Sequence, residues 1–214
     1  MMTHATPETV IAAQLQETAR LHAELPAAQR ALIAKAAGLM TQALHTGHKI
    51  IWCGNGGSAT QSQHMAAEFV GRFQRERRSL PSISLTENMA SVTAIGNDYA
   101  YEQIFSRQLE GLGQRGDVVV GLSTSGNSSN VLQALRKAKM LKLATIGLSG
   151  GSGGQMATWC DVCICVPSTV TARIQEVHLT IGHIFCGLIE ETLLAAPSRA
   201  ALPGRRRTAA SSTR

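Results

Sequence analysis

Apolar residues recur at helical spacing along the first 47 residues, and Pro26 divides this region into two stretches, 7–25 and 26–44. The pattern predicts two long helices ahead of the core. Short apolar runs then alternate with helical segments. The predicted strands are KIIWCG, SISL, DVVVGLS, LATIGLS and DVCICVPS. Further helices are predicted at about residues 59–73, around 90, at 102–112 and 127–140, in a short glycine-started segment, and at 173–194.

The apolar runs of the predicted strands are continuous rather than alternating, and nearly every run is followed by a helical segment. This arrangement is typical of a parallel sheet covered on both faces. We therefore predict a doubly wound α/β fold with a mostly parallel, five-stranded sheet. Such sheets bind ligands at the carboxyl ends of their strands. Here those ends carry the polar loops GNGGSAT, STSGNSSN and SGGSGGQ.

Length and composition fit one domain, expected over residues 1–195, because 214 residues with 44% apolar content bury a sizeable core. The net charge of +6 comes mostly from five arginines in residues 196–214, and without them 15 basic residues face 14 acidic ones. This near-neutral body argues against a specific nucleic-acid-binding face. The tail, rich in Ala, Ser, Pro and Arg, is expected to be disordered.

Two features of the chain predict a soluble, cytoplasmic protein with no membrane partner. The N-terminal residues lack a basic stretch followed by a long apolar run, and no segment reaches about 20 uninterrupted apolar residues. The five cysteines are an odd number without the spacing of a disulfide framework. The CxxC in WCDVCICVPS has no second thiol pair and lies in a strand-like run, so we expect reduced core thiols rather than a redox or metal site.

The first predicted strand runs into Asn55, Gly56, Gly57 and Ser58 before a helix begins. Glycines allow a tight turn here, and the free amides at a helix start favour an anion. The loop is neither the dinucleotide pattern GxGxxG nor a phosphate loop closed by GK[ST]. By itself this turn is weak evidence, because many glycine-rich turns only reverse the chain.

The loop after DVVVGLS is more specific, because four hydroxyls precede one helix: Ser123, Thr124, Ser125 and Ser128. One of them might serve only as a helix cap, but capping needs a single hydroxyl. Four hydroxyls without a charge suit a neutral phosphate cradle that uses the helix dipole.

His64 and Glu68 are four residues apart on the helix that follows the first glycine turn, so they share one face. Imidazole and carboxylate are a zinc-competent pair, although such pairs are also common on solvated surfaces. The apolar final helix contains Gln175, His178 and His183. Gln175 and His183 lie about 80° apart around a helix and Gln175 and His178 about 60°. Spacing alone leaves both histidines open, and a satisfied core residue is the alternative to a ligand for either of them.

In combination, the segments GNGGSA, QHMAAEFVGRF, AIGNDY, FSRQLEGLGQRGDVVVGLSTSGNSSN and RIQEVHLTIGHIFCGLIE resemble the phosphoheptose isomerases of the sugar isomerase (SIS) superfamily. The resemblance covers about residues 10–195 and leaves only the basic tail outside. It implies an SIS-type, flavodoxin-like fold and one zinc ion per subunit. The implied zinc ligands are His64, Glu68, Gln175 and His183.

The resemblance also implies that Glu68 is the catalytic base and His183 the acid. The implied substrate contacts are Asn55, Gly56, Gly57, Ser58, Glu68, Arg72, Asn97, Asp98, Ser123, Thr124, Ser125, Ser128 and Gln175. Gln61 and Asn88 depart from the family, some members of which carry aspartate at these two positions. Both departures bear on the exact substrate rather than on the reaction class.

The expected reaction converts sedoheptulose 7-phosphate to D-glycero-D-manno-heptose 7-phosphate, a precursor of bacterial lipopolysaccharide heptose. Uncovered apolar faces on the terminal helices predict a symmetric oligomer, and the resemblance implies a homotetramer with sites between subunits. Two alternatives remain: an isomerase of another sugar phosphate, and a noncatalytic SIS protein of the replication-initiation type. The latter lacks the acid/base residues, whereas Glu68 and His183 are both present here.

Overall fold

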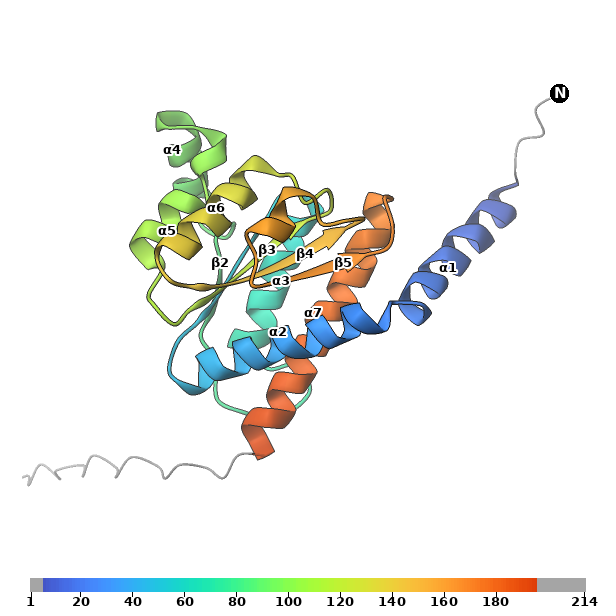
Figure 1. Ribbon diagram of the computed structural model, residues 1–214, viewed down its shortest axis with the longest axis horizontal. Coiled ribbons are helices and arrows are strands. Elements are labelled where there is room, and N and C mark those ends of the chain that lie inside the picture. Colours follow the sequence, from blue (N-terminus) through green and yellow to red (C-terminus); the bar gives the residue numbers. More distant parts are fainter. Residues whose placement is uncertain (1–5, 196–214) are drawn as a thin grey trace, which may run out of the picture.

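The computed structural model describes residues 6–195, and the predicted tail at 196–214 lies outside this range. Figure 1 shows the described chain as a sheet flanked by helices, with one helix extending away as an arm. The helices are α1 (Pro7–Ala23), α2 (Ala27–His45), α3 (Gly57–Val70), α4 (Met89–Asp98), α5 (Ser106–Leu112), α6 (Ser129–Met140) and α7 (Thr171–Ala195), with 3₁₀ turns η1 (Tyr101–Gln103) and η2 (Gly154–Thr158). The strands are β1 (Ile50–Gly54), β2 (Ser82–Ser84), β3 (Val118–Ser123), β4 (Ala144–Gly150) and β5 (Val162–Val166).

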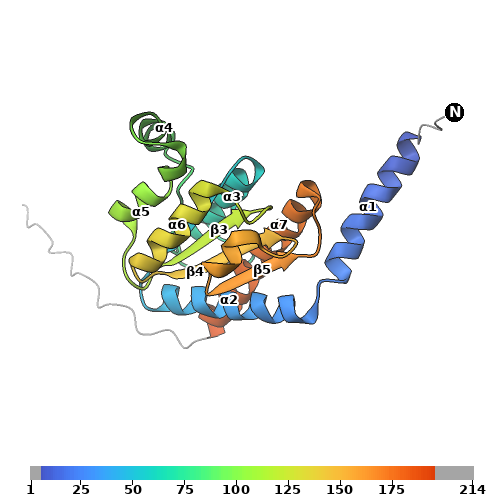
Figure 2. The ribbon, with the colours of Figure 1, turned by 45° about the horizontal axis from the view of Figure 1, so that its top comes forward.

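The five strands form one parallel sheet in the order β2-β1-β3-β4-β5. This order confirms the predicted doubly wound fold, whose ligand crevice lies where the winding reverses, between β1 and β3. Side chains of β1 alternate between two cores: Ile50 and Trp52 pack with α2, α3 and α7, whereas Ile51 and Cys53 pack with α5 and α6. The sheet therefore lies between two helix layers (Figure 2), and its strands are apolar on both faces.

The predicted helix at 59–73 ends earlier than expected, because α3 stops at Val70. Gly71 follows as the C-cap, and the Arg77 guanidinium donates to the main-chain oxygens of Glu68, Phe69 and Gly71. These carbonyls thus gain partners outside the helix. The segment from residue 71 to 81 then crosses to β2 without regular secondary structure.

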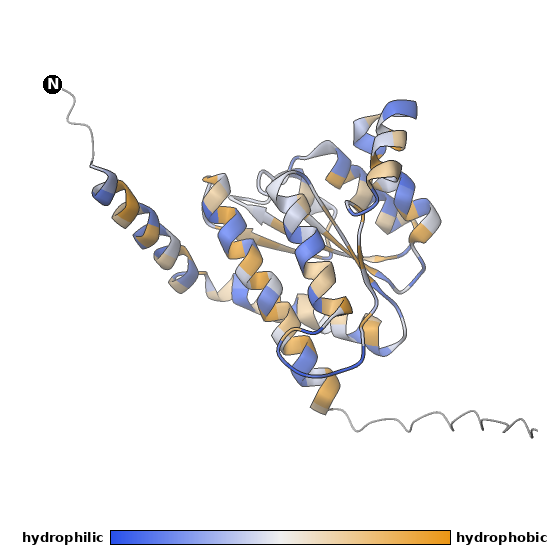
Figure 3. Ribbon diagram, turned by 180° about the vertical axis from the view of Figure 1, so that it is seen from behind, coloured by the Kyte–Doolittle hydropathy of each residue, from blue (hydrophilic) through white to orange (hydrophobic). Residues whose placement is uncertain are grey.

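The first and last helices differ in how much apolar surface they bury. On α1, the side chains of Ile11 and Leu15 are 59% and 65% exposed, and apolar and polar residues alternate along this arm (Figure 3). Helix α7 is long and apolar enough to span a membrane by length and composition alone. Its buried residues include Ile181 and Phe185, which belong to the core. Core packing therefore accounts for part of the apolar character of α7, while Ile184, Leu188 and Leu194 remain exposed.

Candidate functional site

The first polar loop turns from β1 into α3 through Gly56, whose φ of +54° lies in the left-handed region that favours glycine. Gly56 is the N-cap, so no side chain occupies the first amides of α3. Of the predicted contacts here, Ser58 is only 4% exposed and packs against Gly54, where a Cβ would come within 2.8 Å of the Ser58 Cβ. Ser58 thus packs under the turn on its buried side, whereas Gly56 and Gly57 are exposed.

Asn55 joins this loop to α6. The Asn55 Nδ2 donates to Asn130 Oδ1 at 2.8 Å, and the Asn130 Nδ2 donates back to Asn55 Oδ1 at the same distance. The Tyr101 hydroxyl donates to the same Asn55 oxygen at 3.1 Å. Because Asn130 is buried, this reciprocal amide pair fixes the spacing between the first and second polar loops.

The second polar loop brings three of its four predicted hydroxyls together. The Ser123 and Ser128 Oγ atoms lie 2.8 Å apart, and the Ser123 and Ser125 Oγ atoms 3.5 Å apart. Ser128 is the N-cap residue of α6, but its hydroxyl makes no capping bond. Ser125 is exposed and Thr124 is half-buried. The hydroxyls therefore lie at the start of α6 without capping its first amides.

A third loop, between β4 and η2, packs against the second polar loop. Gly126 has a φ of +67°, and a Cβ there would come within 2.0 Å of the Gly153 carbonyl oxygen. The Asn127 Oδ1 accepts from the main-chain amide of Gln155 at 3.0 Å. Glycine is required at position 126 both by its dihedral angle and by this close approach.

The most informative part of the site is a cluster of His64, Glu68 and His183. The His64 Nε2 lies 3.0 Å from the His183 Nε2 and 3.5 Å from the Glu68 Oε1, and one ligand atom from each residue fits within a 4.8 Å group. Close packing of α3 on α7 brings them together, because Gly182 admits the Met65 sulfur where a Cβ would come within 2.2 Å of it.

This donor set fits a zinc ion. Tetrahedral zinc with bonds of about 2.0–2.1 Å places its ligand atoms about 3.4 Å apart, and the separations of 3.0 and 3.5 Å from the His64 Nε2 lie on either side of that value. Two imidazole nitrogens with one carboxylate oxygen are also the donor types found in catalytic zinc sites. His64 is exposed, and Glu68 and His183 are half-buried, so the cluster remains accessible.

Gln175, the fourth predicted ligand, lies on α7 beside the first polar loop. Its side-chain amide faces the start of α3, where a Cβ on Gly57 would come within 2.7 Å of the Gln175 Oε1. The Gln61 Nε2 donates to the Gln175 main-chain oxygen at 2.7 Å, whereas the Gln61 Oε1 is buried and has no hydrogen-bond partner among the described residues. Gln61, one of the two departures from the family, is thus in direct contact with a predicted ligand residue.

The two histidines that spacing left open occupy different environments. His178 is 1% exposed, and its Nε2 lies 3.1 Å from the Ser149 carbonyl oxygen. Burial lowers the pKa of His178 to about 4, although the contact with Ser149 opposes the shift. His178 is therefore a neutral core residue, whereas His183 lies in the cluster with His64.

Three further predicted contacts belong neither to the polar loops nor to the cluster. Asn97 and Asp98 are exposed at the end of α4, and the Asn97 Nδ2 donates to Asp98 Oδ1 at 2.8 Å. The Arg72 side chain is 60% exposed and lies 3.7 Å from the Glu76 carboxylate. Asn88, the second departure, caps α4 by accepting from the Ser91 amide at 3.0 Å, a role that aspartate performs equally well.

The five cysteines are free, with Cys53 and Cys186 buried and the other three half-buried. The Cys163 and Cys165 sulfurs lie 3.9 Å apart on β5. A contact with Cys160, together with burial, raises the pKa of Cys163 to about 12. A raised pKa disfavours the reactive thiolate.

Sequence reasoning missed three residues next to the cluster. The Phe73 ring stacks on His183, with ring centroids 5.4 Å apart and planes inclined by 20°. Glu190, 2% exposed, accepts the amide of Phe73 and pairs with Arg77. The sequence offered one signal for them, which is that Glu190 lies within a very apolar helix. A buried carboxylate requires hydrogen-bond or charged partners.

The strand order and the polar loops at its switch point fit a sugar isomerase (SIS) domain, and the family model of that domain matches residues 15–150. A phosphoheptose isomerase of Rhodospirillum rubrum is 53% identical over 161 residues, covering 75% of this chain and 86% of that protein. Two phosphoheptose isomerase structures also match. The Neisseria gonorrhoeae structure has a TM-score of 0.82 at 41% identity, and the Francisella tularensis structure 0.84 at 36%. Both matches cover 87% of this chain and 100% of the other.

The chain belongs to the phosphoheptose isomerases, a family of aldose-ketose isomerases. This membership agrees with the sequence resemblance.

Proposed function

We propose that the protein converts sedoheptulose 7-phosphate to D-glycero-D-manno-heptose 7-phosphate at a site holding one zinc ion per subunit. The observation that carries the proposal is the convergence of His64, Glu68 and His183. We assign Gln175, whose side-chain amide lies beside Gly57, as the fourth ligand because the family resemblance implies it. When bound, zinc supplies a Lewis acid that polarises the substrate carbonyl and its neighbouring hydroxyl.

The chain's own residues move the protons. Converting the ketose to the aldose transfers a proton from C1 to C2 through an enediolate, and the carbonyl passes from C2 to C1. Glu68 removes the C1 proton, and His183 acts as the acid that returns a proton. Stacking on Phe73 leaves the His183 Nε2 edge free to face His64.

The second polar loop holds the phosphate. Its hydroxyls and the first amides of α6 offer donors without a fixed positive charge. The dipole of α6 favours an anion at this end. Asn55 and the exposed Gly56 and Gly57 border the sugar between this loop and the cluster.

The reaction supplies a precursor of the heptose units in bacterial lipopolysaccharide and takes place in the cytoplasm. We assign the protein a homotetrameric assembly, because α1 exposes Ile11 and Leu15 on an arm that packs on little else than α7. Predicted contacts that lie away from the cluster, such as Asn97 and Asp98, suit a site shared between subunits.

A noncatalytic SIS protein is the main alternative. It would have no need for a base and an acid facing one another, whereas Glu68 and His183 both face His64 here. An isomerase of another sugar phosphate is the second alternative, since the hydroxyl loop recognises phosphate rather than the sugar.

A coupled assay tests the proposal by following aldose phosphate formation from sedoheptulose 7-phosphate with zinc-loaded protein. Wild type is expected to turn over, whereas Glu68→Gln and His183→Ala are expected to lose at least about a hundredfold in kcat. The proposal fails if folded, zinc-loaded wild type is inactive. Activity on a different sugar phosphate alone would support the second alternative.

A further inference from the structure

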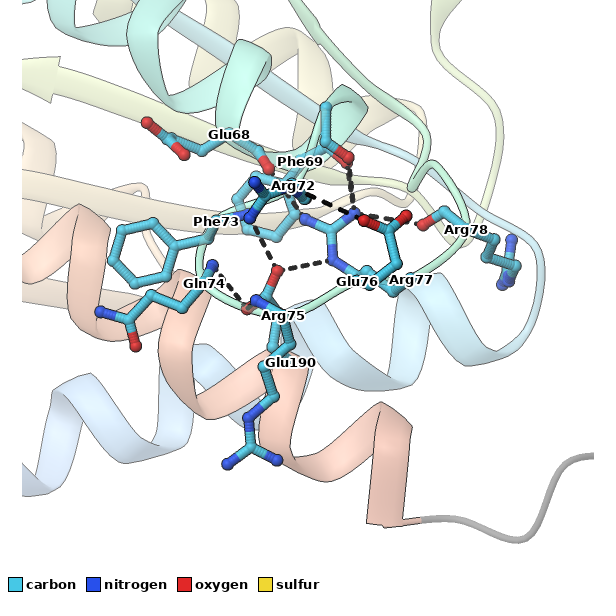
Figure 4. Close-up of polar contacts among 11 residues, drawn as sticks. Glu68, Phe69, Arg72, Phe73, Gln74, Arg75, Glu76, Arg77, Arg78 and Glu190 are labelled. Atoms are coloured by element: carbon cyan, nitrogen blue, oxygen red, sulfur yellow. Dashed lines mark hydrogen bonds and ion pairs between the residues drawn. The ribbon is translucent and has the colours of Figure 1, made fainter.

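The segment from residue 71 to 77 follows α3 and is held by a buried carboxylate on α7 (Figure 4). The Glu190 Oε1 accepts the amide of Phe73 at 2.9 Å, and its Oε2 accepts the amides of Gln74 and Arg75 at 3.0 Å each. The Arg77 Nε donates to Oε1 at 2.8 Å. One side chain therefore fixes three consecutive main-chain amides and a guanidinium.

The Glu190–Arg77 pair is sealed from solvent, with side chains 2% and 4% exposed. Burial opposes the charge of Glu190, but the three amides and the Arg77 guanidinium outweigh it and lower the pKa of this carboxyl. A buried carboxylate with this many donors is held in one geometry. The pair is thus a rigid connection between the end of α3 and the C-terminal part of α7.

Arg77 reaches from this pair back to the helix that carries the proposed base. Its Nη2 donates to the main-chain oxygen of Glu68 at 2.8 Å, and its Nη1 donates to the main-chain oxygen of Phe69 at 2.9 Å. The last turn of α3 is therefore anchored at the residue whose side chain belongs to the cluster.

Glu190 reaches the proposed acid through Phe73. The amide of Phe73 is bound by Glu190, and the ring of Phe73 stacks on His183. His183 and Glu190 are seven residues apart on α7, so they share one face. Gly187, between them on that face, lies beside the ring, where a Cβ would be in ordinary contact at 4.0 Å from the Phe73 Cε1.

We propose that Glu190, Arg77 and Phe73 are positioning residues, which hold the Glu68 main chain and the His183 ring at the separation that the metal and the proton transfers require. The proposal rests on the function proposed above for Glu68 and His183. It adds residues that touch neither the substrate nor the metal but act through those that do.

The test uses Phe73→Leu, which removes the stacking ring and leaves the Glu190–Arg77 pair in place, and Phe73→Tyr, which restores a ring. Zinc affinity is measured by competition with a chromogenic chelator, and kcat and KM are measured with sedoheptulose 7-phosphate. We expect Phe73→Leu to lose about 10–100-fold in zinc affinity and in kcat, with KM nearly unchanged. Phe73→Tyr should recover most of both losses.

Glu190→Gln tests the pair itself. A glutamine side chain has only one acceptor oxygen, so it cannot accept from the three main-chain amides through two oxygens as the carboxylate does. Glu191→Gln is the matched control: Glu191 is the neighbouring residue, its side chain is 66% exposed, and it lies 3.7 Å from Arg75. We expect Glu190→Gln to lose zinc affinity and kcat about as strongly as Phe73→Leu, and Glu191→Gln to match wild type.

Two results would overturn the inference: wild-type zinc affinity and kcat in Phe73→Leu, or equal losses in Phe73→Leu and Phe73→Tyr. If Glu190→Gln fails to fold, the comparison of the two Phe73 variants still decides. If wild type does not isomerise the sugar, the proposed function fails, and zinc affinity alone then decides on the positioning role. The two failures are therefore distinguishable.

Discussion

Gly57→Ala moves the Gln175 side chain without changing its chemistry. A Cβ at Gly57 would lie 2.7 Å from the Gln175 Oε1, 2.8 Å from its Nε2 and 3.0 Å from its Cδ. Ordinary contact begins at 3.4 Å, so the amide must retreat by the difference from 2.7 Å, which is 0.7 Å. A displacement of this order at a site that orients a substrate costs about 10–100-fold in rate, or about 1.4–2.7 kcal/mol of transition-state stabilisation.

The same substitution should leave the fold nearly unaffected. The obstructing atoms are the end of a flexible side chain, and alanine is favoured over glycine in a helix by roughly 0.5–1 kcal/mol. We therefore expect the free energy of unfolding to change by less than about 1 kcal/mol, while kcat/KM and zinc affinity fall. Urea denaturation, steady-state kinetics and chelator competition measure the three quantities.

Gly38→Ala is the control, because it makes the same change within α2 where nothing lies within 4 Å of the new Cβ. This variant should be slightly more stable than wild type and fully active. Unchanged kinetics and zinc affinity in Gly57→Ala would refute the role assigned to Gln175. A loss of several kcal/mol in stability would instead show that Gly57 is required for folding.

Three further predictions concern stability and assembly. His178 is neutral when folded, whereas the unfolded chain protonates it below about pH 6.5. The free energy of unfolding should therefore fall by about 3 kcal/mol as the pH drops from 6.5 to about 4. Urea titrations should show a flatter pH dependence in His178→Phe, and equal slopes in the two proteins would contradict this. Gly126→Ala should lose about 3 kcal/mol of unfolding free energy, because the Cβ meets the Gly153 carbonyl at a positive φ; wild-type stability in urea would be inconsistent with that contact. Leu15→Asp on the exposed face of α1 should lower the mass of the assembly in light scattering, and an unchanged mass would exclude this face from the interface.

Much of the fold follows from local patterns in the sequence. The five apolar runs became the five strands, because a parallel sheet covered on both faces needs apolar residues at consecutive positions. The polar loops after β1 and β3 lie at the same edge of the sheet for the same topological reason. The end of α3 was predicted three residues late, because its carbonyls are satisfied by Arg77, which contacts the helix only in the folded chain.

The part of the site that the sequence did not indicate depends on long-range pairing. Arg77 lies in the charged run Arg75–Arg78, and its partner Glu190 lies 113 positions further along the chain. The helical angles of α7 likewise could not choose between His178 and His183. The choice depends on which helix face meets α3, and the close contact between Gly182 and Met65 determines that face.

Isomerisation of sedoheptulose 7-phosphate in D₂O, followed by NMR, tests the central claim most directly. With zinc-loaded wild type, we predict conversion to the aldose phosphate with solvent deuterium entering at C2, as expected when an enzyme base removes a proton and returns one from a site in contact with water. Glu68→Gln should show neither conversion nor exchange at C1 of the ketose. Conversion by Glu68→Gln at the wild-type rate, or no conversion by folded, zinc-loaded wild type, would contradict the account.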